Sequence, residues 1–121
     1  MTKTIEEYSL AEVMQKIEEV ISEKPEPIQG FNASYQFDIT EEEEGTYQLI
    51  FQDGKVSVKE GAEASADCTL TMSLANFRQF LIGKLNGTVA FMTGKLKIKG
   101  DIGKAMKIEN VLRQYNVKDH L

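Results

Sequence analysis

Four short segments between residues 33 and 72 alternate apolar and polar side chains with a period of two. This alternation is typical of strands that bury one face and expose the other, so it predicts a sheet covered on one side. Three connections separate the segments: the acidic run Glu41–Gly45, the pair Asp53-Gly54, and a stretch of small residues, 61–66. An Asp-Gly pair suits the positive φ angles of a two-residue hairpin. We expect the four strands in meander order with antiparallel pairing.

One helix is predicted before these strands in the sequence, and another is predicted after them. Residues 9–23 open with a capping box, Ser9 and Glu12, and then repeat apolar residues at helical spacing. After the fourth strand, Ser73 is a favourable N-cap for a second helix whose apolar residues share one face. Glycines within residues 83–87 end this helix.

The remaining chain alternates helix and strand. A short helical turn is predicted around residues 89–92, and a fifth strand over residues 95–99, where lysines alternate with aliphatic residues. Asp101 is the expected N-cap of a last helix that runs to about Tyr115. The complete order predicts an α+β fold, in which helices cover a five-stranded, mostly antiparallel sheet in a sandwich-like arrangement.

The last helix carries more apolar surface than one packing layer requires. At about 100° per residue its apolar positions span roughly 220°, whereas a helix on a single layer needs a stripe of a little over about 100°. These positions are Ile102, Ala105, Met106, Ile108, Val111, Leu112 and Tyr115. The helix should therefore contact two partners. One is the sheet, and the other is a neighbouring helix, a second subunit, or an apolar ligand held between helix and sheet.

Composition and charge limit the possible functions. The 121 residues suit one domain, residues 1–121, and 41% apolar with 27% charged residues is ordinary globular usage. A net charge of −5 argues against nucleic-acid binding as the main task. The charge is uneven, because residues 1–66 hold five lysines against fifteen acidic residues, whereas residues 67–121 hold nine basic residues against four acidic ones.

Cysteine content and the first residues indicate a compartment. The one cysteine, Cys68, cannot form an intramolecular disulfide, and the first residues lack the apolar run of a signal peptide. No stretch approaches the roughly 18 apolar residues needed to cross a bilayer. We therefore expect a soluble, cytoplasmic protein.

Catalytic chemistry has little support in the sequence. Acid–base catalysis most often uses a histidine, and the one histidine, His120, stands next to the end of the chain. Cys68 alternates with Leu70 and Met72 on a strand, where a thiol behaves as a small apolar group. The acidic run Glu41–Glu44 is interpreted as a solvated hairpin tip, with a metal site as the alternative. Because zinc spacing and a phosphate-binding glycine loop are absent from the sequence, we expect a binding protein with no cofactor and no metal.

The sequence from residue 83 to residue 108 resembles the C-terminal signature of the sterol carrier protein type 2 family. In that pattern a helical turn with Ala and an aromatic residue precedes Gly-Lys-Leu-Lys-Ile-x-Gly and a helix with Ala-Met-Lys. This chain has GTVAFMTGKLKIKGDIGKAMKI over residues 87–108. Looser similarity extends to Tyr35–Asp38, to the Asp53-Gly54-Lys55 hairpin and to the strand Asp67–Met72, so nearly all of residues 9–115 fits the pattern.

The resemblance implies a five-stranded sheet and helices that enclose an apolar tunnel for a fatty acid, acyl-CoA, a phospholipid or a sterol-like molecule. It also implies which side chains lie at the ligand: Phe77, Phe80, Leu81, Ala90, Phe91, Met92, Ala105, Met106, Glu109 and Leu112. Two positions depart from the family pattern. Gly87 stands where many members have a proline, and Glu109 stands where members often have a glutamine. A carboxylate at this position would repel the head group of a fatty acid.

Three functional hypotheses follow. The first is non-catalytic binding and transfer of a long-chain lipid inside the cell. The second is an accessory domain that presents a hydrophobic substrate to a partner enzyme or mediates protein interaction. The third is an enzyme that uses Cys68 or carboxylates in the tunnel. The sequence leaves open which lipid is bound, and whether the chain is a monomer or a weak dimer.

The positive charge of five lysines predicts that the protein makes transient contact with an anionic membrane surface. They are Lys95, Lys97 and Lys99 near the outer face of the fifth strand, with Lys104 and Lys107 on the last helix. Each contributes about 1 kcal/mol near such a surface. The alternative is a sheet face that is merely solvated.

Overall fold

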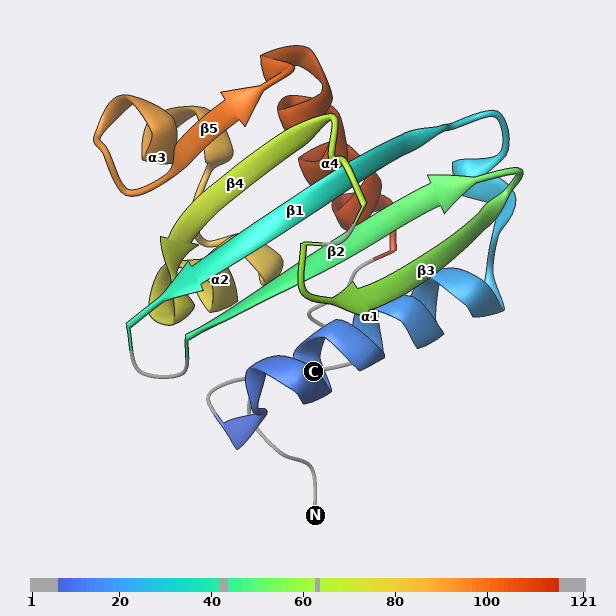
Figure 1. Cartoon of the computed structure of the whole chain (residues 1–121), viewed down its shortest axis with the longest axis horizontal. Coiled ribbons are helices and arrows are strands. Elements are labelled where there is room, and N and C mark those ends of the chain that lie inside the picture. The colour runs from blue at the N-terminus through green and yellow to red at the C-terminus, as the bar shows by residue number, and fades with distance from the viewer. Residues whose placement is uncertain (1–6, 42–43, 63, 116–121) are drawn as a thin grey trace.

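A computed structural model describes residues 7–41, 44–62 and 64–115 of the chain (Figure 1). The helices are α1 (Leu10–Glu23), the 3-10 helix η2 (Glu26–Ile28), α2 (Leu74–Leu81), α3 (Gly87–Met92) and α4 (Ile102–Gln114). The strands are β1 (Ala33–Thr40), β2 (Gly45–Gln52), β3 (Lys55–Glu60), β4 (Cys68–Ser73) and β5 (Lys97–Gly100). His120 and the middle of the acidic run, residues 42 and 43, lie outside the described residues.

Local sequence signals set the ends of these elements. Ser9 Oγ accepts from the N–H of Glu12 (3.1 Å), and the Ser9 N–H donates to the Glu12 carboxylate (2.9 Å), which completes the predicted capping box. Ser73 and Asp101 cap α2 and α4 in the same way. The pair Asp53-Gly54 has φ angles of 55° and 74°, so it forms the predicted hairpin turn between β2 and β3.

The sheet has the strand order β3-β2-β1-β4-β5. β1 pairs in parallel with β4 and the other neighbours are antiparallel, so the sheet is mixed but mostly antiparallel, as predicted. The predicted meander order is wrong for β4, which lies beside β1 and not beside β3. The reason is that α1 already lies along the outer edge of β3, where the N–H of Val58 donates to the carboxylate of Glu18 (2.9 Å).

The connection from β3 to β4 crosses the open face of the sheet, over β2 and β1 (Figure 1). Gln48, a 2% exposed residue of β2, bonds both backbone groups of Ala64: its Nε2 donates to the carbonyl (2.6 Å), and its Oε1 accepts from the N–H (3.2 Å). The end of the connection is held at β1, where the N–H of Ser34 donates to the carboxylate of Asp67 (2.9 Å). These bonds guide β4 to the free edge of β1.

The two faces of the sheet differ in polarity. The face toward the helices is apolar and buried, with Tyr35, Phe37, Ile39, Leu49, Phe51, Cys68, Leu70 and Met72. The opposite face carries polar side chains such as Gln36, Thr69 and Lys99, which are neighbours in the register of β1, β4 and β5. The core therefore lies between the sheet and the helices. Within the described ranges, no helix combines the length and hydrophobicity that a membrane span requires.

Two buried tyrosines tie α4 to the rest of the fold. The hydroxyl of Tyr35, on β1, donates to the carbonyl of Lys104 in the first turn of α4 (2.7 Å). The hydroxyl of Tyr115, at the C-terminal cap of α4, donates to the carbonyl of Lys24 at the end of α1 (2.6 Å). Burial raises the pKa of both phenols, which favours the protonated form that donates these bonds. Helix α4 is thus fixed across the sheet at both ends.

Candidate functional site

Helix α2 places three of the residues that the family resemblance assigned to the ligand. Phe77 comes three residues before Phe80 and four residues before Leu81, so the three side chains share the face of α2 that is turned to the core. All three are buried. The ring of Phe77 lies against the ring of Phe37 on β1, with centroids 5.5 Å apart.

Helix α4 contributes to the same region. Ala105 and Leu112 are buried and belong to the same core cluster as the residues of α2. Met106 is partly buried at the margin of the cluster, and its Sδ lies 3.4 Å from the hydroxyl of Thr88 on α3. The wide apolar stripe of α4 is therefore only partly buried, because Ile102 is 50% exposed.

Helix α3 adds one small side chain. Asn86 Oδ1 accepts from the N–H of Val89 (3.1 Å) and so caps the helix, and Ala90 is 1% exposed. The expectation that Phe91 and Met92 join Ala90 inside is not met, since they are 40% and 79% exposed. A six-residue helix has one inward face, and the two residues after Ala90 are rotated from it by about 100° and 200°.

The structure thus gathers six of the predicted residues into one buried group, which we call the apolar layer. It comprises Phe77, Phe80, Leu81, Ala90, Ala105 and Leu112. The layer lies between the sheet and helices α2, α3 and α4, which follow one another between residues 74 and 114.

Glu109 stands where α2, α3 and α4 meet. Its Oε2 accepts from the N–H of Gly87 (3.0 Å) and from Nη2 of Arg113 (2.7 Å). The side chain of Glu109 is 12% exposed, whereas that of Arg113 is 45% exposed. A Cβ on Gly87 would lie 2.9 Å from Oε1 of Glu109 and 3.5 Å from the ring of Phe80, so a residue without a side chain lets α3 approach α4 this closely.

Comparison with known proteins identifies the fold and the family. Residues 14–113 match the model of the SCP-2 sterol transfer family. The chain belongs to this family. It is 38% identical over 117 residues to hydroxysteroid dehydrogenase-like protein 2 of Xenopus tropicalis, which covers 96% of this chain and 28% of that protein. It is 37% identical to human sterol carrier protein 2, over 85% of this chain and 19% of that protein. The chain therefore spans less than a third of either relative.

Solved structures of the SCP-2 type have the same architecture. The solution structure of sterol carrier protein domain 2 of Helicoverpa armigera has a TM-score of 0.76 and 28% identity, and covers 96% of this chain and 94% of that one. Sterol carrier protein 2 from Yarrowia lipolytica, in its apo form, has a TM-score of 0.71 and 30% identity, with coverages of 86% and 89%. The predicted α+β class, with helices covering a five-stranded, mostly antiparallel sheet, is confirmed.

The two departures from the SCP-2 pattern are in direct contact. Gly87 and Glu109 were considered separately in the sequence, because they are 22 positions apart and the pairing of α3 with α4 was unknown. In the structure, the backbone N–H that a proline at position 87 would lack is the donor to the Glu109 carboxylate. Arg113, which sequence reasoning did not single out, offsets the charge of that carboxylate. The spacing of four residues between Glu109 and Arg113 on a helix was the available signal.

Cys68 does not have the environment of a nucleophile. It is 1% exposed on the inner face of β4. Burial raises the pKa of its thiol to about 11, and the negative charges of Asp101 and Asp67 act in the same direction. Such a thiol is protonated at neutral pH and reacts poorly. An enzyme that uses Cys68 as its nucleophile is therefore disfavoured.

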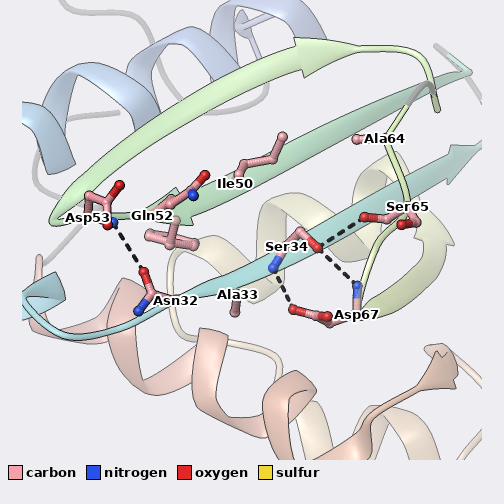
Figure 2. A pocket seen from close by; sticks show the side chains of 10 residues that line it. Asn32, Ala33, Ser34, Ile50, Gln52, Asp53, Ala64, Ser65 and Asp67 are labelled. Atoms are coloured by element: carbon pink, nitrogen blue, oxygen red, sulfur yellow. Dashed lines mark hydrogen bonds between the residues drawn. The ribbon is translucent and has the colours of Figure 1, made fainter.

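A depression lined by both polar and apolar residues lies on the opposite, open face of the sheet (Figure 2). It measures about 580 Å³ and is lined by β1, β2 and the connection to β4. Its polar groups bond to one another: Ser34 Oγ donates to the carbonyl of Ser65 (3.2 Å) and accepts from the N–H of Asp67 (3.1 Å), and the N–H of Asp53 donates to Asn32 Oδ1 (3.1 Å). These bonds hold the connection on the sheet, so the fold accounts for them, and the apolar layer remains the candidate site.

Proposed function

We propose that this chain binds a long-chain lipid, such as a fatty acid, acyl-CoA, a phospholipid or a sterol-like molecule, in the apolar layer. We further propose that it exchanges the lipid with membranes without altering it chemically. The observation that carries the proposal is the convergence of α2, α3 and α4 on one buried apolar region of an SCP-2 fold. Helix α3 covers this region with the single small side chain of Ala90.

The short helix α3 is the element that we expect to move when a lipid enters. It has six residues, and its contacts with α4 include the Gly87–Glu109 hydrogen bond and the contact of Thr88 with Met106. Helix α4 is held by tyrosines at both ends, so it supplies a fixed wall. A displacement of α3 would open a tunnel between α3 and α4 without disturbing the sheet.

The energetics suit exchange more than permanent storage. Burial of an acyl chain gains about 0.8 kcal/mol per methylene, so roughly sixteen carbons gain on the order of 13 kcal/mol before the cost of ordering. A bilayer offers the same chain nearly the same gain. A carrier therefore needs to match the membrane, and the ligand can leave on contact.

Native mass spectrometry of the gently purified chain and displacement of a fluorescent fatty acid test the proposal. The informative variant is Ala90→Leu, which fills the apolar layer, and the matched control is Ala75→Leu, because Ala75 is exposed on α2. Ala90→Leu adds three carbon atoms, and filling this space should weaken binding about 50-fold, at about 0.8 kcal/mol per carbon. Ala75→Leu should bind like the unmodified chain.

The outcomes separate binding from misfolding. Thermal unfolding of both variants shows whether Ala90→Leu is folded, and Leu112→Ala, which enlarges the same layer, gives a second test if it is not. Absence of any bound lipid in the spectrum, together with no fluorescent displacement, would overturn the proposal. Equal affinities of folded Ala90→Leu and Ala75→Leu would place the ligand elsewhere.

A second candidate function is supported by the relatives. This chain matches only 28% of hydroxysteroid dehydrogenase-like protein 2 of Xenopus tropicalis, so the same domain occurs there within a longer protein. An accessory domain that presents a hydrophobic substrate to a partner enzyme fits that arrangement. Affinity capture that recovers one enzyme in stoichiometric amount would favour this function, and a monomer without such a partner would favour the carrier.

A further inference from the structure

Helix α3 exposes three large apolar side chains. Val89 is 54% exposed, Phe91 is 40% exposed and Met92 is 79% exposed. Single exposed apolar residues are common, but three on one six-residue helix form a local apolar surface. The same helix faces the apolar layer through Ala90, so its outer surface is the part of the protein that lies directly above the proposed lipid site.

The sequence around α3 is uniformly basic. Residues 83–100 contain four lysines and no acidic residue, although the whole chain has a net charge of −5. Lys95, Lys97 and Lys99 are exposed. Lys95 lies next to α3, because the N–H groups of Lys95 and Leu96 both donate to the carbonyl of Ala90, and Lys97 and Lys99 follow on β5. The apolar side chains of α3 are therefore bordered by positive charge.

The most acidic helix of the described chain, α1, lies at the opposite edge of the sheet. Helix α1 holds four glutamates and one lysine, and it packs along β3, which is the edge strand farthest from β5 (Figure 1). Net charge thus differs between the two edges, although Glu41 lines one depression together with Lys95 and Lys97. A negatively charged surface would attract the α3 and β5 edge and repel the α1 edge.

We propose that α3 and the lysines next to it form the surface with which this protein docks onto an anionic lipid bilayer. This docking surface comprises Val89, Phe91 and Met92 together with Lys95, Lys97 and Lys99. The lysines approach the lipid head groups, and the aromatic and thioether side chains enter the interface between head groups and acyl chains. The inference rests on the proposed lipid exchange for its purpose, since the docked helix is the one that covers the apolar layer.

The structure also narrows the set of lysines that the sequence suggested. Lys104 Nζ lies 3.2 Å from the carboxylate of Asp67, and Lys107 Nζ lies 5.6 Å from the centre of the Phe31 ring. Phe31 lies just before β1 and Asp67 just before β4, so both lysines contact residues at the beginnings of these two strands. We do not include these two lysines in the docking surface.

Co-sedimentation with vesicles of phosphatidylcholine, with and without phosphatidylserine, tests the inference. We expect binding only to the vesicles that contain phosphatidylserine. The double variant Lys95→Gln/Lys97→Gln should bind about 25-fold more weakly, because each lysine near an anionic surface contributes about fivefold. The matched control is Lys55→Gln/Lys59→Gln, which removes two exposed lysines from β3 at the opposite edge and should bind like the unmodified chain.

The apolar side chains of the docking surface are tested separately. The double variant Phe91→Ser/Met92→Ser should lose binding to the same vesicles even at low salt. Circular dichroism checks that this variant is folded, and Met92→Ser alone, at the most exposed position, serves if it is not. Equal binding by the two lysine variants, or unchanged binding by a folded α3 variant, would overturn the docking surface. Dimerisation that the Phe91→Ser/Met92→Ser change abolishes, without vesicle binding, would assign α3 to a second copy of the chain and overturn it as well.

A failure of the docking surface can be distinguished from a failure of the carrier function. A chain that holds a fatty acid but ignores phosphatidylserine contradicts the docking surface alone. A chain that binds these vesicles through α3 but carries no lipid contradicts the carrier function and supports the docking surface.

Discussion

Glu109 shows how one side chain couples two helices. Its carboxylate accepts from the backbone of α3 and from a guanidinium one turn further along α4, and the contact with α3 exists only because position 87 has a free N–H and lacks a Cβ. The carboxylate that the sequence suggested would repel a fatty-acid head is in fact paired with Arg113. We infer that it stabilises the closed position of α3.

A double-mutant cycle tests this coupling. Gly87→Ala should destabilise the chain by about 1 kcal/mol, because the added Cβ displaces the Glu109 carboxylate and breaks its hydrogen bond. In a Glu109→Ala background the same change should cost nothing or stabilise, since Ala is a better helix former than Gly. Urea unfolding of the four proteins gives the coupling energy, expected near 1 kcal/mol. Additive effects would show that the two residues do not interact.

The raised pKa of the Cys68 thiol predicts how the free energy of unfolding depends on pH. Its thiol pKa is raised from the ordinary 9.0 to about 11 in the folded state, chiefly by burial. The folded state therefore favours the protonated thiol, so this contribution is complete below pH 9 and is lost as the pH rises toward 11. A change of about two in the pKa corresponds to about 2 to 3 kcal/mol in the free energy of unfolding. Urea unfolding should show a smaller alkaline loss for Cys68→Ala than for the unmodified chain.

Alkylation gives an independent check on the same thiol. Iodoacetamide at neutral pH should modify Cys68 slowly in the folded chain and rapidly in urea, because only the exposed thiolate reacts. Rapid modification under native conditions would contradict the buried environment and would return the thiol to consideration as a nucleophile.

Among the elements, α4 is the one whose position depends most clearly on polar contacts. Its first turn is bonded to β1 through Tyr35, and its C-terminal cap is bonded to the end of α1 through Tyr115. The chain thereby holds a partly exposed apolar helix in place, and α3 contacts this helix through the Gly87–Glu109 hydrogen bond and the contact of Thr88 with Met106. This arrangement fits a fixed wall and a movable cover.

Removal of either hydroxyl should loosen the corresponding end of α4. Tyr35→Phe and Tyr115→Phe are each expected to lower the free energy of unfolding by about 1 kcal/mol, since each removes one part-buried hydrogen bond. Hydrogen exchange should accelerate in the first turn of α4 for Tyr35→Phe and in the last turn for Tyr115→Phe. Tyr47→Phe is the control, because the hydroxyl of Tyr47 makes an exposed 3.5 Å contact with Glu60. A loss of stability in this control equal to that in the other two would remove the basis of the prediction.

The elements themselves were largely predictable, but the placement of β4 in the sheet was not. Caps and periodicity located α1, α2 and α4, and the Asp53-Gly54 turn located the second hairpin, because these signals act over a few residues. The position of β4 depends on Gln48, whose amide holds the crossing connection from across the sheet. A local pattern of alternation cannot show such a long-range bond.

The candidate site was predictable in part for the same reason. The family resemblance identified Phe77, Phe80, Leu81, Ala90, Ala105 and Leu112, which the structure gathers into the apolar layer. It placed Phe91 and Met92 beside them, whereas the orientation of a six-residue helix depends on which residue meets the core. Contacts of Glu109 with Gly87 also required the three-dimensional arrangement of α3 and α4.

At the scale of the whole molecule, the sheet separates two different environments. One face supports the apolar layer and helices α2, α3 and α4, and the other face carries polar side chains and the crossing connection of Figure 2. A ligand in the apolar layer and a ligand in the open-face depression would therefore protect different parts of the chain. This difference allows the binding face to be determined without knowledge of the natural lipid.

Palmitate is a suitable probe for that experiment. We expect a saturating concentration to raise the melting temperature, because a ligand that binds only the folded state stabilises it by about 2.7 kcal/mol at one hundred times its dissociation constant. Hydrogen exchange should slow in α2, α3 and the facing turns of α4, where the apolar layer lies. It should remain unchanged in α1 and in the connection from β3 to β4. Protection centred on that connection and on the adjoining part of β1 would instead place the ligand in the open-face depression, and the apolar layer would then be an ordinary packed core.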